Sequence, residues 1–430
     1  MLKRFLLYLI QTTIIFSSPF KLVELNQTSK IKFIHEPFSV EKDGEYDRIK
    51  SSSNKFLLEP GLPEMALYTF NYGIESGSSY DISFSIISSE VYENVVLSPY
   101  QTTHSSHDKS FQKNSDFYLS GQPYPQENLV SEVGNIRGNE FVTVQFTPYK
   151  YDPRSKQLTV YTNVEINIEE IKSDNDYLSV KKRSELFDGI YNNMIINANT
   201  NRDQEFQRPS ILYIHSDYNS SQLLNYLQPL VDWRHQQGYV VDVVSIAETG
   251  TSTSLIKNYI SNAYNNWDNP PEYVCFVGDA DGTYAVPTYY VQEGNGWSGA
   301  AGEGDYPYSL IDGGVNDLYA DVILGRISIR SLTEDLNTVV NKIIGYEKAY
   351  GGIDDWQEKA ALVGDPYESG ISTVITNQYI EQLMYTYVVE DVRTKYEGNN
   401  FDDFMRAQFN DGIAFLNYRG IYGFSGFTSN

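Results

Sequence analysis

The first half of the chain alternates apolar and polar residues with the period of two that is typical of β-strands. Residues 80–97 and 156–171 show this alternation and are rich in β-branched residues. Turn-forming sequences such as DPRSKQ, at residues 152–157, separate such runs. We therefore interpret residues 25–172 as an antiparallel, β-sandwich-like domain.

From residue 209 the pattern changes to short apolar runs that alternate with amphipathic segments. Residues 272–279 have almost no alternation, as expected for a parallel strand that is covered on both faces. Residues 209–430 are thus predicted to form an α/β domain with a doubly wound, mostly parallel sheet. The strands are expected at residues 211–215, 239–246, 272–279, 321–329, 359–365, 391–396 and 413–418, and the helices at residues 221–238, 252–267, 332–350, 373–386 and 401–412.

Residues 173–208, between these two parts, are polar and rich in Asn, Asp, Lys and Arg. This composition predicts an exposed linker. Its basic residues also make it a candidate processing segment, with cleavage after Arg183, Arg202 or Arg208.

The amino terminus carries Lys3 and Arg4, then an apolar stretch to Phe16 and two serines. This pattern predicts a signal peptide at residues 1–18 and a secreted or cell-surface protein. The apolar stretch is short for a membrane span, and no other stretch approaches spanning length. The single cysteine excludes an internal disulfide, which is compatible with a bacterial surface protein.

The chain is strongly acidic, with 56 Asp and Glu against 32 Lys and Arg and a net charge of −24. This charge argues against binding to nucleic acid or to an anionic membrane surface. Solubility explains the acidity, and divalent cation binding is the weaker explanation.

Ligands of doubly wound sheets bind beyond the carboxyl ends of the strands, so the loops there deserve comparison. Asp279, Asp305 and Asp365 lie in such loops. No GxxxxGK[ST], early GxGxxG or HExxH motif occurs, and DADG at residues 279–282 lacks the later ligands of an EF-hand. A nucleotide enzyme and an HExxH zinc peptidase are therefore not indicated.

The chain offers no convincing Cys–His pair. Cys275 lies in the middle of an apolar strand, where packing in the core is the expected role. His215 ends a predicted strand and could serve as either a structural or a catalytic group, whereas His235 is expected at the surface. His35, His104 and His107 lie in the β domain, without a further zinc signature.

Three segments of the α/β half are YVCFVGDADGTYAVP (273–287), GDYPYSLIDGGVNDLYADVILGRISI (304–329) and DGIAFLNYRG (411–420). These segments resemble the gingipain-type cysteine peptidases. In the β half, residues 57–70 and 124–168 are similar to that family's prodomain. The resemblance covers residues 57–430 and implies a caspase-like catalytic domain behind an inhibitory prodomain, with a cysteine nucleophile, a histidine partner and backbone amides for the oxyanion.

The resemblance also implies where the catalytic loop lies. Asn417, Tyr418 and Gly420 match the family's loop, which continues through Gly423. The histidine position holds Ile421, which cannot transfer a proton, and the nucleophilic cysteine is expected beyond Asn430. The catalytic domain is therefore expected to be incomplete within this chain.

Further sites follow from the same resemblance. Asp305 aligns with an acidic residue of the substrate pocket, where a carboxylate would select Arg or Lys. Asp279, Asp281 and Asp365 are candidate ligands for a structural calcium ion, and no other cofactor is required.

The sequence thus predicts a secreted cysteine endopeptidase zymogen that acts on proteins or peptides. The prodomain would be an intramolecular inhibitor that cleavage releases. Two other interpretations stay open, namely a catalytically inactive relative that binds peptides or partners, and a surface-adhesion protein that keeps only the fold.

Overall fold

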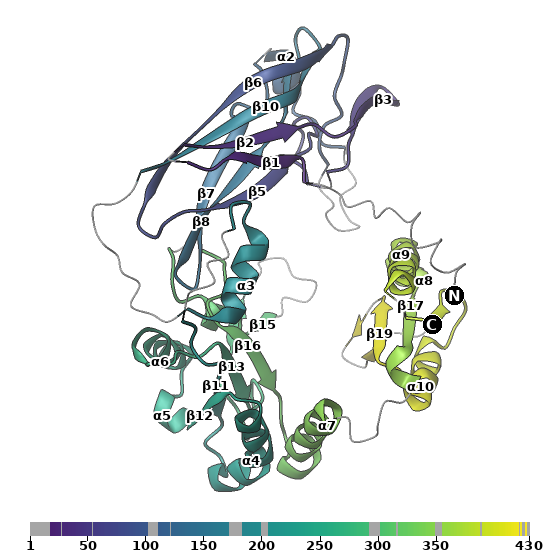
Figure 1. The fold of residues 1–430 in the computed structure, drawn as a ribbon. Helices are drawn as coiled ribbons and strands as arrows, with labels where there is room; N and C mark the ends of the chain where they lie inside the picture. Colours follow the sequence, from purple (N-terminus) through teal and green to yellow (C-terminus); the bar gives the residue numbers. More distant parts are fainter. Residues whose placement is uncertain are drawn as a thin grey trace, which may run out of the picture. The chain divides into compact units, whose positions relative to one another are not determined.

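A computed structural model provides the structure of the chain (Figure 1). It consists of two compact units, Met1–Leu336 and Asn337–Asn430. Within the described residues, no helix has the length and apolar character needed to cross a bilayer. The described residues are 18–26, 28–53, 55–101, 111–120, 122–171, 183–198, 205–291, 302–314, 317–348, 355–387, 389–420, 422–423 and 426–427.

The amino-terminal part is a β-sandwich, as its alternating sequence predicts. One antiparallel sheet has the order β1-β2-β10-β6, with β9 added to β10, and the other has the order β5-β8-β7. Fully buried Phe33, Val144 and Ile166 come from both sheets and share one core. The strands are β1 (Phe20–Glu24), β2 (Thr28–Ile34), β5 (Tyr68–Gly73), β6 (Ser79–Tyr92), β7 (Leu129–Ile136), β8 (Asn139–Phe146), β9 (Tyr149–Asp152) and β10 (Gln157–Ile171), beside the hairpin β3 (Ser39–Asp43) and β4 (Tyr46–Lys50) and the short helix α2 (Ser115–Ser120).

The hairpin of β7 and β8 turns through only two residues. Ile136 pairs with Asn139, so Arg137 and Gly138 form the loop. Both have positive φ, 51° and 78°, as a type I′ turn requires. Such a turn matches the twist of the two strands and directs the Arg137 side chain away from the sandwich.

Residues 183–198 correct the expectation of an exposed linker. They contain helix α3 (Glu185–Met194), whose Phe187 and Tyr191 are buried. These two aromatic rings are one helical turn apart and pack against Ile136 and Phe141 of the sandwich. The polar composition concealed this narrow apolar face.

A four-stranded parallel sheet completes the first unit. Its order is β12-β11-β13-β16, so the chain winds in both directions from β11, as predicted. Ile256 and Ile260 of α6 pack against Leu212 and Ile214 on one face of the sheet. The connection from β11 to β12 runs in the opposite direction to the connection from β12 to β13, so its helix α4 lies on the other face. The elements are β11 (Ser210–His215), α4 (Ser220–Gln236), β12 (Val240–Ser245), α5 (Ile246–Thr249), α6 (Thr253–Asn266), β13 (Tyr273–Val277), β14 (Tyr289–Val291), β15 (Gly302–Gly304), η1 (Tyr306–Ser309), β16 (Ile323–Ile327) and η2 (Leu332–Leu336).

The second unit holds a separate three-stranded parallel sheet of order β18-β17-β19. Within the first unit, β16 pairs with β13. Each unit thus has parallel pairing, as the strand patterns predict. The elements are α7 (Asn337–Glu347), η3 (Asp355–Glu358), β17 (Lys359–Gly364), α8 (Pro366–Ser369), α9 (Ser372–Thr386), β18 (Asp391–Lys395), α10 (Phe401–Asp411), β19 (Phe415–Arg419), β20 (Tyr422–Gly423) and β21 (Gly426–Phe427).

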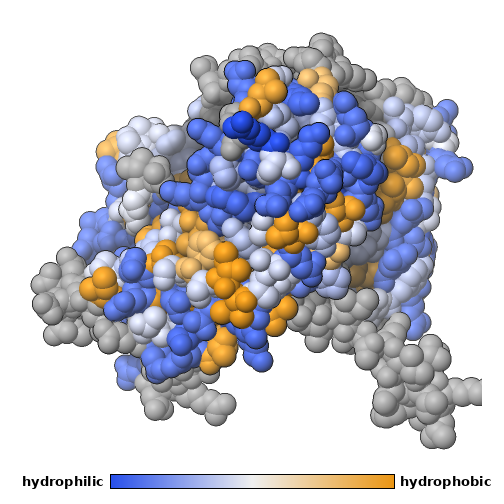
Figure 2. Space-filling view, turned by 90° about the horizontal axis from the view of Figure 1, so that it is seen from above, coloured by the Kyte–Doolittle hydropathy of each residue, from blue (hydrophilic) through white to orange (hydrophobic). Residues whose placement is uncertain are grey.

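Hydrophilic side chains cover most of the face seen in Figure 2, and hydrophobic ones lie in small groups between them.

Candidate functional site

The loop after β13 closes tightly at the carboxyl end of the four-stranded sheet. The backbone N–H of Asp279 donates to the carbonyl oxygen of Tyr284 at 3.1 Å. Gly278 has a φ of 156°, and a Cβ atom there would collide with that same carbonyl oxygen. The Asp279 carboxylate accepts hydrogen bonds from the backbone of Ala280 at 2.9 Å and from Nε of Arg330 at 3.1 Å. Asp279 therefore already has internal partners.

Asp305, the predicted substrate-pocket carboxylate, forms a two-pronged ion pair with Arg326. Nε and Nη2 of Arg326 donate to its two oxygens at 2.8 and 2.7 Å, and the Thr288 hydroxyl donates at 2.8 Å. The side chains of Asp305 and Arg326 are only 18% and 13% exposed. A basic substrate side chain would have to compete with a guanidinium that already matches the carboxylate geometry.

Arg326 also ties neighbouring loops together. Its Nη1 donates to the carbonyl oxygens of Gly278 at 3.0 Å and Val286 at 2.9 Å. Its guanidinium carbon lies 4.9 Å from the ring centre of Phe276. Sequence reasoning missed this residue, although a cation within the apolar run of residues 321–329 was a usable signal.

The three candidate calcium ligands are not gathered into one site. No group of three or more His, Cys, Asp or Glu side chains within the described ranges could hold a metal ion. Asp281 is exposed, and Asp365 caps α8 by accepting the backbone N–H of Tyr367 at 3.0 Å. Calcium binding therefore stays a prediction without support from these carboxylates.

Cys275 and the described histidines are in structural positions. Burial raises the pKa of the Cys275 thiol to about 12, so a thiolate is scarce at neutral pH. His35 lies between the Glu36 carbonyl oxygen and the Tyr149 hydroxyl, and burial lowers its pKa.

His215 is buried at the end of β11, where one ring nitrogen lies 2.7 Å from the carbonyl oxygen of Ser216. His235 is exposed in the last turn of α4, as expected. His104 and His107 lie outside the described residues.

In the second unit, Asn417 on β19 is held by a buried amide of α9. Its Nδ2 donates to Oδ1 of Asn377 at 2.7 Å. Asn377 is fully buried and donates to the carbonyl oxygens of Val363 at 2.9 Å and Thr373 at 3.1 Å. This network joins β17, β19 and α9 at the place where the predicted catalytic loop begins.

The loop after β19 is also fixed to the end of β17. The backbone N–H of Asp365 donates to the carbonyl oxygen of Arg419 at 2.8 Å. A Cβ atom at Gly420 would lie only 3.0 Å from Cβ of Asp365, so this close approach favours glycine. Tyr418 beside it is half-buried, which raises the pKa of its phenol.

Further along this loop, Gly423 pairs with Gly426 in the short hairpin of β20 and β21. Ile421, at the family's histidine position, lies outside the described residues. The described part is thus a glycine-containing loop on a rigid base, with no acid–base group among Asn417, Gly420 and Gly423.

Comparison with known proteins identifies the family. Residues 204–429 match the family model of peptidase family C25, and residues 27–206 match the model of the C25 propeptide. The chain is 25% identical over 325 residues to gingipain R2 of Porphyromonas gingivalis, covering 70% of this chain and 41% of that protein. It is 24% identical over 343 residues to Lys-gingipain of the same organism, covering 73% of this chain and 18% of that protein.

The chain thus spans less than half the length of these curated relatives. Among solved structures, it resembles the Arg specific cysteine proteinase gingipain R with a TM-score of 0.42 and 23% identity. That comparison covers 53% of this chain and 51% of the other. Because the peptidase match alone covers more than half of the sequence, the chain belongs to peptidase family C25, the gingipain-type cysteine peptidases, and carries the propeptide of that family.

Proposed function

We propose that this protein is a secreted cysteine endopeptidase made as a zymogen. The observation that carries the proposal is the order of two family matches, with the C25 propeptide at residues 27–206 and the C25 peptidase at residues 204–429. The signal sequence at residues 1–18 supports secretion. The peptidase half is proposed to be a caspase-like domain.

In this proposal the loop after β19 lines the catalytic centre. The Asn377–Asn417 hydrogen bond and the Asp365–Arg419 contact would keep its backbone in place. Cys275 is not proposed as the nucleophile, because burial raises the pKa of its thiol to about 12. The proton acceptor is a group other than Ile421.

The substrate pocket is proposed without Asp305 as its recognition group. Its two oxygens already bind Arg326, which also holds the loops beside it. The substrates are proteins or peptides, and their preferred side chains are to be found by assay.

The propeptide is proposed to inhibit the peptidase until the chain is cut between them. Two of the three candidate arginines, Arg183 and Arg208, are held in place by an ion pair and a hydrogen bond, respectively. Arg183 pairs with Asp188 at 2.7 Å and is followed by buried Ser184. Arg208 bonds through its backbone N–H to Asn269 and precedes Pro209. We therefore favour Arg202, which lies outside the described residues.

The proposal is tested with a thiol-directed, peptide-based activity probe on the protein isolated from its natural source. We expect the label, located by mass spectrometry, on a residue other than Cys275. The Cys275→Ser variant is the control and should keep the same labelling. Labelling at Cys275, or no labelling after the propeptide has been removed, would contradict the proposal.

A second candidate function is a non-catalytic, peptide-binding relative. It is favoured by one observation, the isoleucine at position 421 where the family has histidine. Such a protein would still bind peptides or partners but would leave the probe unreacted, so the same experiment separates the two.

A further inference from the structure

The tip of the β7–β8 hairpin inserts an arginine into the α/β part of the first unit. Nη1 of Arg137 donates to the carbonyl oxygens of Pro271 at 3.0 Å and Asp321 at 2.8 Å. Nη2 donates to Oε1 of Gln207 at 3.1 Å and to the carbonyl oxygen of Pro270 at 3.4 Å. All four acceptors lie outside the β-sandwich.

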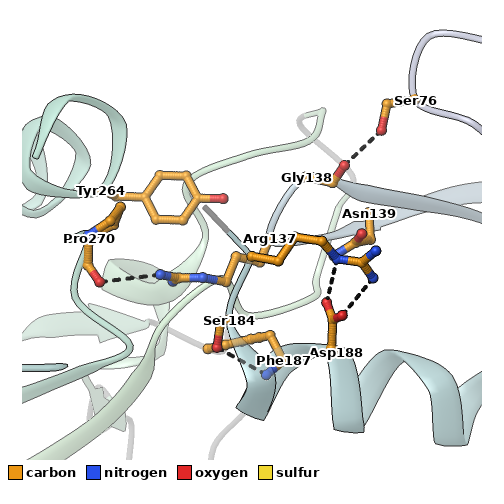
Figure 3. Close-up of a pocket in the computed structure, with 10 residues that line it drawn as sticks. Ser76, Arg137, Gly138, Asn139, Ser184, Phe187, Asp188, Tyr264 and Pro270 are labelled. Carbon is orange, nitrogen blue, oxygen red and sulfur yellow. Dashed lines mark hydrogen bonds and ion pairs between the residues drawn. The ribbon is translucent and has the colours of Figure 1, made fainter. Parts of the chain in front are cut away.

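Two aromatic rings enclose the same guanidinium. Its carbon lies 4.9 Å from the ring centre of Phe187 on α3 and 5.1 Å from that of Tyr264 on α6. Figure 3 shows Arg137 extending past Tyr264 to Pro270, beside a cavity of about 250 Å³. Burial lowers the pKa of Arg137, which marks it as a cation withdrawn from water.

The backbone of the tip contributes two more contacts. The N–H of Arg137 donates to Oδ1 of Asp321 at 2.7 Å, and the N–H of Asn135 donates to Oδ2 of Asp317 at 3.1 Å. Asp321 is fully buried, and its second oxygen accepts the N–H groups of Ile311 at 2.8 Å and Asp312 at 2.7 Å. The chain before β16 that includes Ile311, Asp312, Asp317 and Asp321 is called the receiving loop. The Asp321 carboxylate therefore binds both the backbone of this loop and the hairpin tip.

These contacts lie at the amino-terminal edge of the four-stranded parallel sheet. Pro270 and Pro271 precede β13, and Asp321 precedes β16. The carboxyl ends of those strands, with Asp279, are at the other edge. The hairpin thus holds the sheet at the edge away from the crevice where ligands of such sheets bind.

We propose that the Arg137 tip is the anchor by which the β-sandwich stays bound to the four-stranded α/β part after the intervening chain has been cut. The anchor is a recognition surface for the other half of the same protein, and Arg137 determines its specificity. A planar guanidinium with several directed donors suits a set of fixed carbonyl oxygens, which an ammonium would not satisfy in the same way. This inference rests on the proposed cleavage between propeptide and peptidase, but its test needs no peptidase activity.

The test uses the full chain with a recognition sequence for an exogenous protease inserted between residues 199 and 204. After cutting, we expect the wild-type halves to co-elute in size-exclusion chromatography. The Arg137→Asn variant keeps the turn, because Asn-Gly is favoured in type I′ turns, but removes the guanidinium. Its halves should bind at least about 100-fold more weakly, as expected for a buried arginine at the centre of an interface.

Two more variants make the result specific. Arg137→Lys keeps the charge without the planar donors and should give an intermediate loss. Arg154→Asn changes an exposed arginine in the β9–β10 turn and should leave the affinity unchanged. Thermal unfolding of the uncut proteins checks that each variant is folded.

Asp317→Ala, on the receiving loop, is an independent variant that should weaken binding by about tenfold, as the loss of one charge-assisted hydrogen bond. The proposal is overturned if the wild-type halves separate on cutting, or if Arg137→Asn or Asp317→Ala binds as tightly as wild type. A natural protein that has no peptidase activity would contradict the proposed function, but it would not contradict the proposed anchor.

Discussion

At the scale of single residues, the neighbours of each carboxylate decide what it does. In the sequence, Asp279, Asp305 and Asp365 looked like equivalent acids at strand ends. In the structure, Asp279 binds Arg330, Asp305 binds Arg326, and Asp365 caps a helix. Sequence order could not show this, because Arg326 lies 21 residues from Asp305. A carboxylate that is already matched by a guanidinium has lost most of its capacity to recruit another cation.

The Asp305–Arg326 pair gives a direct prediction about stability. Asp305→Ala should lower the free energy of unfolding by about 3 kcal/mol, because it leaves a buried guanidinium without its charge partner. Urea denaturation measures the change. Asp281→Ala, an exposed carboxylate on a nearby loop, is the control and should change stability by less than about 0.5 kcal/mol. Equal effects of the two variants would show that the pair is not a structural requirement.

At the scale of elements, the pattern of apolar and polar residues predicted where strands and helices lie better than which elements they contact. Both long alternating runs became strands of the sandwich, and the 2-1-3-4 order of the first parallel sheet gives the winding that was expected. Helix α3 was missed because only two aromatic residues of a polar stretch, Phe187 and Tyr191, form its buried face. The hairpin tip was missed as a contact, although a two-residue Arg-Gly loop was visible.

The junction between the hairpin tip and the loop before β16 should make stability depend on pH. Burial raises the pKa of Asp321 from 3.8 to about 6, although three backbone N–H groups bind its carboxylate. The folded protein therefore takes up this proton at a higher pH than the unfolded chain. The contribution of Asp321 to stability is then fully present below about pH 4 and is lost as the pH rises through 6.

The measurement is the free energy of unfolding of wild type and Asp321→Asn between pH 4 and 7. As the pH rises over this range, wild type should lose up to about 3 kcal/mol of unfolding free energy relative to Asp321→Asn. The backbone N–H of Arg137 lowers the pKa of Asp321 and the charge of Asp312 raises it, so both effects are part of the measured difference. Parallel curves would mean that the Asp321 carboxyl titrates as an ordinary exposed acid.

At the scale of the whole molecule, the order of propeptide and peptidase is the basis for the proposed cleavage between them. We predict that Arg202→Ala prevents cleavage of the chain between the two halves in the natural secreted protein, whereas Arg183→Ala and Arg208→Ala do not. Arg183 is bonded to Asp188, and the bond after Arg208 precedes a proline. Amino-terminal sequencing of the mature protein would find the new terminus at residue 203. A terminus at 184 or 209 would contradict the assignment.

The sequence by itself determined the family, the order of the two halves, the sandwich and the parallel α/β pattern. These follow from local periodicity and from motifs that are contiguous along the chain. Tertiary structure alone decided that Asp305 pairs with Arg326, and that Arg137 reaches the carbonyl oxygens before β13 and β16. The physical reason is that a buried charge takes whichever partners the fold brings within hydrogen-bonding distance, and these partners are far away along the chain.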